Sequence, residues 1–334
     1  MSQIERLEVV DAEIIDDDDL FTANDGPQSY GVVRGRYRFP PPPGWHPTKV
    51  IRRTPANPLG LPDWYRMTNV VSAFSDQERL QLWLEWKLFM GLRVADGVLF
   101  DEWMSERIEQ MEPDAQKALA NSYGERARRA AHADAAARRG TARHKMMDTY
   151  LTTGEVTGTR SMRQQLASAM AALERCGFTV MDTEFKVWHP AAGGTMGTSD
   201  ARVMCQRTGQ VGILDWKTQA RFWTWQEIGG QLYGYDSAPW NWSGPPDDRG
   251  RWEEATPSTL LGHEDGQFAG QRVALVAHMP QAPGPGQVPV EIHEVSMEYG
   301  RGVLEVAERN LELRSVGRST AVGRRPSGIR PPRG

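Results

Sequence analysis

Cysteine is scarce in this sequence. Its 334 residues include only Cys176 and Cys205, so one chain cannot supply the four thiolates of a structural zinc site or an iron–sulfur cluster. Two isolated cysteines also suit a reducing compartment better than a disulfide framework. We therefore expect no iron–sulfur cluster, and we expect a cytoplasmic protein.

Two further features are missing, a long apolar run and a phosphate-binding loop. No stretch approaches the roughly 18 apolar residues of a membrane span, and the N-terminus lacks the basic and apolar pattern of a secretory signal. We therefore expect no membrane partner. The sequence contains no Gly-x-x-x-x-Gly-Lys-Ser/Thr segment, which argues against a helicase motor in this chain.

Charge is unevenly distributed along the chain. The formal net charge of −4 argues against a wholly basic nucleic-acid coat. Near the N-terminus, the acidic run at 16–19 predicts disorder, or else a short motif that docks on a basic pocket of a partner or on a basic channel of the protein itself. At the other end, residues 316–334 include five arginines, which predict a disordered tail with non-specific affinity for phosphates.

The hydrophobic pattern predicts an α/β protein with several parts. Hydrophobic residues make up 39% of the chain, enough for a core of about five mixed strands flanked by helices. We expect an acidic and then proline-rich extension, partly disordered, over 1–60, a helical lobe over 61–135, the core over 136–315 and the arginine-rich tail over 316–334.

Apolar spacing and end signals locate the individual elements. Ser75 and Glu78 form a capping-box pattern that begins a helix ending at Gly91, and we expect its aromatic residues, including Trp86 and Phe89, to be core. Other helices are expected over 99–111, 113–151 with a bend or break at Gly124 and Gly140, 160–175, 225–235 and 298–314. Other strands are expected over 178–188, 273–279 and 288–295, with a loop over 236–271.

The stretch 195–219 is the most informative part of the sequence. Its pattern predicts two strands joined by a turn at Thr208-Gly209, with Asp200 on the first strand and Asp215 after the apolar run of the second. Period-two alternation places Asp215 and Lys217 on one face. Such a set suits metal-assisted phosphodiester hydrolysis. The carboxylates bind a divalent cation, and the lysine stabilises charge or helps to position and deprotonate water.

Four short segments surround this hairpin in a fixed order. They are Gly140-Thr141-Ala142-Arg143-His144, Gly197-Thr198-Ser199-Asp200, Asp215-Trp216-Lys217-Thr218 and Gln231-Leu232-Tyr233-Gly234-Tyr235. Together they resemble the PD-(D/E)XK nuclease superfamily, and within it the RecB-like exonuclease branch. They are similar to that branch's glycine–threonine–histidine segment, Gly-x-x-Asp, Asp-x-Lys-Thr and Gln-x-x-x-Tyr. The resemblance covers residues 136–315.

This resemblance implies a restriction-endonuclease-like fold and a Mg²⁺-dependent DNA exonuclease. The cation would be held by His144, Asp200, Asp215 and the backbone carbonyl of Trp216, while Lys217 would assist the attacking water. Mn²⁺ should substitute, because oxygen ligands and one imidazole suit both ions. Several relatives carry a four-cysteine iron–sulfur cluster, which the cysteine content argues against here. Short stand-alone nucleases of this kind look like those that bacteriophages encode for DNA recombination or replication in the host cytoplasm.

Several residues near the expected site have two possible roles each. The resemblance implies that Gln231 and Tyr235 contact DNA or buttress the lysine; the alternative is a helix that is simply packed by its tyrosine. Arg139 and Arg143 lie in a basic stretch that predicts either a solvated helix face or a rim for DNA phosphates. Glu184 could support the metal site from its edge or form a salt bridge within the sheet.

Other readings remain open at this point. The tryptophans of the 236–271 loop, Trp240, Trp242 and Trp252, could stack on unpaired bases or pack under the loop. The same site in an open groove would suit a structure-selective or sequence-specific endonuclease. A non-catalytic DNA-binding or scaffold protein could keep the fold, although the complete aspartate, lysine and histidine set favours an enzyme. The expected partners are DNA with single- or double-stranded ends and a recombination or replication protein that binds the acidic run at 16–19, unless that run covers the protein's own DNA channel.

Overall fold

The computed structural model describes residues 31–33, 36–45, 61–74, 78–94, 110–131, 135–218, 225–244, 250–279 and 290–319. The acidic run at 16–19, nearly all of the expected helix over 99–111, and the tail beyond residue 319 lie outside the described residues. Within the described residues, no helix is both long enough and apolar enough to cross a membrane.

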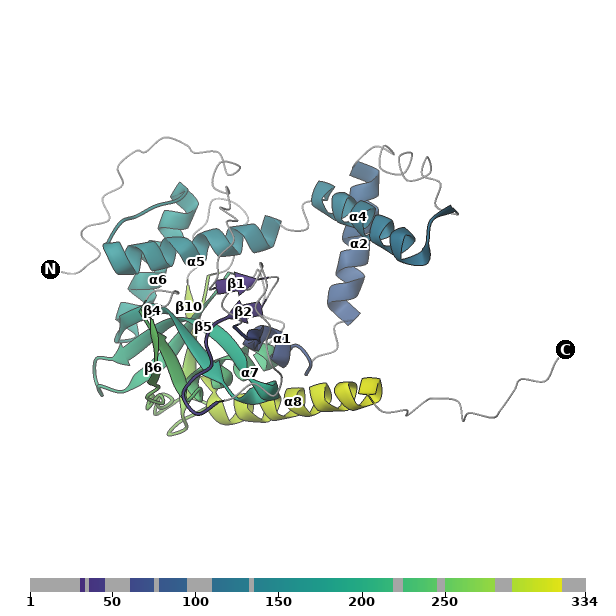
Figure 1. Ribbon diagram of the computed structural model, residues 1–334. Helices are drawn as coiled ribbons and strands as arrows, with labels where there is room; N and C mark the ends of the chain where they lie inside the picture. The colour runs from purple at the N-terminus through teal and green to yellow at the C-terminus, as the bar shows by residue number, and fades with distance from the viewer. Residues whose placement is uncertain are drawn as a thin grey trace.

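A mixed sheet forms the centre of the fold (Figure 1). Within the described residues it has ten strands, twice the expected number. They are β1 (Gly31–Val33), β2 (Arg36–Arg38), β3 (Asp63–Arg66), β4 (Phe178–His189), β5 (Thr195–Cys205), β6 (Val211–Lys217), β7 (Trp240–Ser243), β8 (Arg251–Glu254), β9 (Val273–His278) and β10 (Glu291–Ser296). The extra strands are short additions at the margins of the expected core.

Strand β5 is the hub of this sheet. It pairs antiparallel with β4 along most of its length, antiparallel with β6 over Ala201–Met204, and parallel with β3 at its start. Beyond β6 lie β9, in parallel, and then β10, antiparallel to β9 as expected. Chain segments far apart in the sequence therefore meet beside the β5–β6 hairpin.

Helices cover both faces of the sheet (Figure 1). The helices of the described residues are α1 (Met67–Val71), α2 (Glu78–Val94), α4 (Pro113–Ala130), α5 (Ala135–Thr153), α6 (Arg160–Arg175), α7 (Trp225–Asp236) and α8 (Met297–Ser319), of which α2 and α4 do not cover the sheet. One core lies between the sheet and α5 and α6, and a second lies between the sheet and α1, α7 and α8. The result is a three-layer α/β arrangement.

Helix α6 illustrates how the sequence determines a helix and its buried face. The Thr159 side chain caps its start by accepting from the Met162 N–H at 3.3 Å. Met162, Leu166, Ala169 and Leu173 then fall on one stripe and are buried. The stripe packs on β5, β6 and β9, so it helps to hold the strands that carry the site.

The helical lobe differs from its prediction in several ways. Helix α2 extends past Gly91, which packs closely on Ala127 of α4, and the two helices stand beside the sheet in Figure 1. Trp86 and Phe89 are 53% and 69% exposed, so the prediction that they are core is wrong. Apolar composition predicted the helix, but it could not say whether another element covers its outer face.

The predicted interruptions of the long helical stretch are also misplaced. Gly124 lies inside α4 and Gly140 inside α5, because glycine weakens a helix without necessarily ending it. The chain instead leaves the helix at Ala131, before α5 begins at Ala135.

The stretch over 236–271 is more ordered than a loop. It contains β7 and β8, and the indole N–H of Trp252 donates to the Pro40 carbonyl at 2.8 Å. Trp242 packs at 5.1 Å, centroid to centroid, on Phe39 and at 5.2 Å on Trp252. These rings form an aromatic core with the N-terminal strands, an arrangement that favours packing over base stacking for these tryptophans.

Candidate active site

The β5–β6 hairpin brings the two predicted aspartates together. In its turn Gly209 has a φ of 70°, a conformation that glycine adopts without steric cost. The strands pair antiparallel with Ala201 opposite Leu214, so the next positions along the ladder are Asp200 and Asp215. The predicted hairpin is confirmed, and it sets one carboxylate on each strand.

Asp215 and Lys217 share one face of β6, as the alternation predicted. Lys217 Nζ lies 2.6 Å from Asp215 Oδ2, and the two side chains are only 16% and 4% exposed. Burial raises the pKa of Asp215 to about 6, although Lys217 opposes the rise. Burial alone would lower the pKa of Lys217, but Asp215 and Asp200 raise it overall. The lysine is therefore a cation held in a site that excludes most water.

Helix α5 places His144 beside Asp200. The distance from His144 Nδ1 to Asp200 Oδ1 is 3.3 Å. Burial alone would lower the pKa of His144, but Asp200 and Asp215 raise it above the ordinary value. For Asp200 the balance is opposite. Burial would raise the pKa, whereas His144, Lys217 and the Trp216 N–H lower it. Asp200 is therefore stabilised as a carboxylate.

Trp216 contributes through its backbone. Its amide N–H donates to Asp200 Oδ2 at 2.7 Å, while its side chain is 2% exposed and belongs to the core under α5 and α6. In an extended strand, the N–H and C=O of one residue point to the same side. The Trp216 carbonyl therefore points toward the Asp200 strand, as a role in holding a cation would require.

Glu184 is brought into the same group by an irregularity in β4. Its φ of 50° is unusual for any residue other than glycine. Thr183 before it donates to Asp148 of α5, whereas Phe185 after it packs on the opposite core, so the strand changes the face of its side chains here. Burial, together with Asp200, raises the pKa of Glu184 to about 7.

These side chains form a donor set that fits a hard divalent cation. One ligand atom each from His144, Glu184 and Asp200 lie within 4.8 Å of one another, and Asp215 is on the adjoining strand. Carboxylate oxygens with one imidazole suit Mg²⁺ or Mn²⁺. This group of three contains Glu184 and not Asp215, so it differs from the predicted set of ligands. The position of Glu184 at the metal edge was one of two readings of the sequence.

Gln231 and Tyr235 lie on α7, and Tyr235 is close to both aspartates. Gln231 Nε2 donates to the Tyr235 hydroxyl at 2.9 Å, which confirms that the two residues share a face. Burial raises the pKa of Tyr235 well above its ordinary value, and the nearby carboxylates add to the rise. A Cβ on Gly197 would come within 2.0 Å of the tyrosine ring. The glycine of the second segment therefore makes room for the tyrosine of the fourth.

The first and third segments are also in contact. A Cβ on Gly140 of α5 would meet Thr218 Oγ1 at 3.2 Å, and His144, one helical turn later, meets Asp200. Each of the four segments that carried the sequence resemblance thus contacts at least one of the others. Their order in the sequence did not require this contact.

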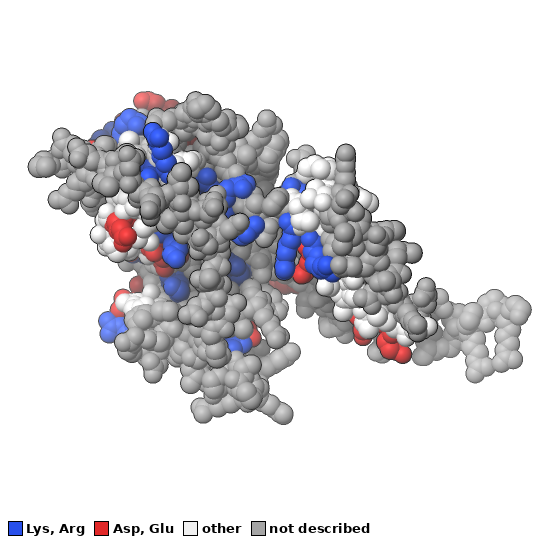
Figure 2. Space-filling view, turned by 90° about the horizontal axis from the view of Figure 1, so that it is seen from above, with Lys and Arg blue, Asp and Glu red and all other residues white. Residues whose placement is uncertain are grey.

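The two arginines that were predicted to bind DNA differ in exposure. Arg143 is 7% exposed and donates to Gln165 Oε1 at 2.6 Å and to the Arg139 carbonyl at 3.2 Å. This position suits a role in joining α5 to α6 better than contact with DNA. Arg139 is exposed. Figure 2 shows lysine and arginine side chains gathered on one face of the molecule.

Sequence reasoning missed Tyr37 as a neighbour of the site. Its hydroxyl hydrogen-bonds Thr198 Oγ1 at 2.9 Å across 161 residues of sequence, and it lies close enough to raise the pKa of Tyr235. No local spacing could reveal this contact, because it depends on β2 joining the sheet.

Neither a scan against models of known protein families nor a search of the curated proteins finds a match for this chain.

Proposed function

We propose that this protein is a Mg²⁺-dependent deoxyribonuclease with the restriction-endonuclease-like fold of the PD-(D/E)XK superfamily. The observation that carries the proposal is the meeting of His144, Asp200, Asp215 and Lys217, which come from one helix and two paired strands. The resemblance to the RecB-like branch extends the proposal to an exonuclease, acting in the recombination or replication of bacteriophage DNA.

The donor set assigns a role to each side chain. His144, Asp200 and Asp215 would hold the cation together with the Trp216 carbonyl, and Glu184 would support it from β4. A cation there supplies charge neutralisation for the phosphate and lowers the pKa of a bound water. Lys217 keeps its proton beside Asp215, so it stabilises negative charge on the phosphate and orients the attacking water.

Two groups around the site hold it rigid. Tyr235 is fixed by Gln231 and by the close approach of Gly197, and Arg143 ties α5 to α6 through Gln165. Side chains that are already fixed need no reorganisation when charge develops in the transition state. These residues therefore position the catalytic groups and are not themselves reactive.

DNA would reach this site across a basic surface. Arg126 and Arg129 are exposed on α4, and Arg138, Arg139 and Lys145 are exposed on α5. Lysine and arginine side chains gather on the face shown in Figure 2. Such contacts neutralise phosphates without reading sequence, and binding through them weakens as salt rises.

The test compares DNA with and without ends. The protein is incubated with Mg²⁺ and end-labelled linear single- and double-stranded DNA, and in parallel with a covalently closed circle; EDTA and Asp215→Asn serve as controls. The proposal expects linear DNA to be degraded and the circle to remain intact. Opening of the circle would instead identify an endonuclease that uses the same site. Binding without Mg²⁺-dependent hydrolysis of any substrate would identify a non-catalytic DNA-binding protein.

A further inference from the structure

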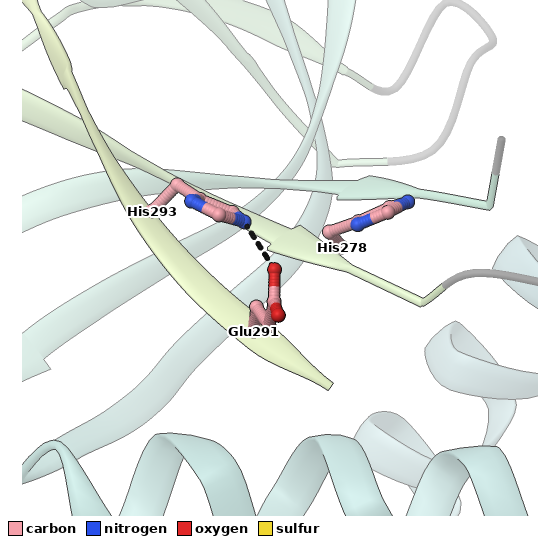
Figure 3. Close-up of side chains that lie close together, drawn as sticks. All are labelled: His278, Glu291 and His293. Atoms are coloured by element: carbon pink, nitrogen blue, oxygen red, sulfur yellow. Dashed lines mark ion pairs between the residues drawn. The ribbon is translucent and has the colours of Figure 1, made fainter. Parts of the chain in front are cut away.

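A second group of possible metal ligands lies outside the β5–β6 cluster, on strands β9 and β10. His278 ends β9 and stands directly opposite Glu291 on β10, so both side chains lie on one face of the sheet. His293 follows Glu291 by two residues and shares that face. Figure 3 shows Glu291 and His293 on one strand and His278 on its neighbour.

The three side chains are close enough to bind one ion. One ligand atom from each lies within 4.8 Å of the other two. His293 Nε2 is 3.2 Å from Glu291 Oε2, and the centroids of the two imidazole rings are 6.3 Å apart. The donors sit on two paired strands, and such elements hold ligands more precisely than loops do.

An ion pair between His293 and Glu291 accounts for two of the three side chains. It does not include His278, whose imidazole belongs to the same close group and comes from the neighbouring strand. One ion bound by all three residues accounts for the whole group.

The kind of donor decides which ion fits. Two imidazoles and one carboxylate are the protein ligands of catalytic zinc sites and of related sites for Fe²⁺, whereas Mg²⁺ favours sites in which oxygen ligands predominate. His278 is 8% exposed, and the Glu291 side chain is 59% exposed. An ion held by these residues would therefore have protein on one side and water on the other.

The surroundings place this group beside the candidate active site without making it part of it. Lys217 pairs in register with His278, so the two groups are neighbours across β6 and β9. The ring of Trp225, at the start of α7, packs edge-on against His293 at 5.4 Å between centroids. This contact packs one of the two imidazole rings against the start of α7.

We propose that His278, Glu291 and His293 bind one divalent transition-metal ion of the Zn²⁺ class, separately from the Mg²⁺ site proposed on β5 and β6. Zn²⁺ at this position ties β10 to β9, its only strand partner among the described residues. The inference stands on these three residues alone and does not require the protein to be a nuclease.

Co²⁺ is the probe for the first test, because its visible absorption reports the ligands around it. The full-length chain, stripped of metal with EDTA, is titrated with Co²⁺ and then with Zn²⁺ as a competitor. The same titration is run on His278→Ala, His293→Ala and Glu291→Gln. Two matched histidine variants serve as controls. His263→Ala changes an exposed residue outside both groups, and His144→Ala removes the imidazole of the other group.

The expected result is one tight Zn²⁺ equivalent, with affinity falling at least about 10-fold in each of the three test variants and unchanged in both controls. Equal affinity and spectrum in wild type, His278→Ala and His293→Ala would overturn the proposal. So would loss of the ion only in His144→Ala.

A second measurement on the unmodified sequence covers the case in which a variant fails to fold. Diethyl pyrocarbonate modifies accessible neutral imidazoles, and mass spectrometry locates the modified residues. Zn²⁺ should protect His293, whose side chain is 31% exposed, at least about 10-fold while leaving His263 as reactive as before. Equal modification of His293 with and without Zn²⁺ would overturn the proposal.

Discussion

Two polar groups lie side by side on one sheet, and they differ in burial and in donor type. On β5 and β6, carboxylates and a lysine are enclosed, with Asp215 and Lys217 only 4% and 16% exposed. On β9 and β10, two imidazoles share one carboxylate, and Glu291 is 59% exposed. One sheet can therefore present two donor sets that suit different metal ions. Burial sets the charge states, and the ligand atoms set the ion.

The largest expected effect is the loss of cleavage when an oxygen donor is removed from the buried group. Asp200→Asn should reduce Mg²⁺-dependent DNA cleavage by at least about 100-fold, because an amide neither neutralises a cation nor pairs with His144 as a carboxylate does. Zn²⁺ binding by the β9–β10 group should be unchanged. Cleavage rates and Zn²⁺ titrations of one preparation check both. Near-normal cleavage would show that Asp200 is not a metal ligand in the reaction, and a parallel loss of Zn²⁺ binding would show that the two groups are not separate.

His144→Ala should have the next largest effect, on the metal requirement. Without the imidazole, activity should need a higher Mg²⁺ concentration, by about 10-fold or more, and Mn²⁺ should partly rescue it. Rates measured against metal concentration, with a thermal melt, separate this from a folding defect. His263→Ala is the exposed control. A large fall in Tm with an unchanged metal requirement would make His144 a structural residue.

Close packing behind the buried group predicts that alanine substitutions at two glycines change the stability of the fold by different amounts. Gly197→Ala sets a Cβ 2.0 Å from the Tyr235 ring and should destabilise the fold by about 1–3 kcal/mol. Gly140→Ala meets Thr218 at 3.2 Å, but a helical alanine gains up to about 1 kcal/mol, so its stability should change little. Urea unfolding of the two variants measures both effects. Equal stabilities would show that Tyr235 does not require this glycine.

The smallest expected effect is a change in the pH dependence of stability at Glu184. Its folded pKa of about 7 lies above the ordinary 4.5, so the folded state binds the proton more tightly. Stability from this group is present below about pH 4.5 and is lost as pH rises through 7. In EDTA, Glu184→Gln should therefore lose less Tm than wild type over this range, whereas the exposed control Glu298→Gln should follow wild type. Identical profiles for Glu184→Gln and wild type would contradict this assignment.

The sequence predicted the parts of the site that depend on local rules. Alternation along β6 placed Asp215 and Lys217 on one face, and a glycine turn aligned β5 with β6. Helical spacing placed Gln231 near Tyr235. Periods of two and of about four residues are read directly from a sequence, so these contacts needed no knowledge of the tertiary fold.

The remainder depended on long-range contacts that spacing does not encode. Glu184 lies at the site where the backbone has a φ of 50°, and no residue pattern predicted this conformation. Tyr37 contacts Thr198 although 161 residues separate them in the sequence. The His278 group forms only because the register between β9 and β10 sets His278 opposite Glu291. Exposure of Phe89 depends on which elements cover α2, which its own apolar sequence could not indicate.

One measurement tests the central claim most directly, that the buried group on β5 and β6 hydrolyses DNA. Single-turnover cleavage of end-labelled linear DNA with Mg²⁺ is compared for wild type, Lys217→Ala and Lys186→Ala, the last being a lysine on neighbouring β4. The account predicts cleavage that is at least about 100-fold slower in Lys217→Ala, near-normal in Lys186→Ala, and DNA binding retained by both. Lys217→Ala that cleaves DNA at the wild-type rate would contradict the account.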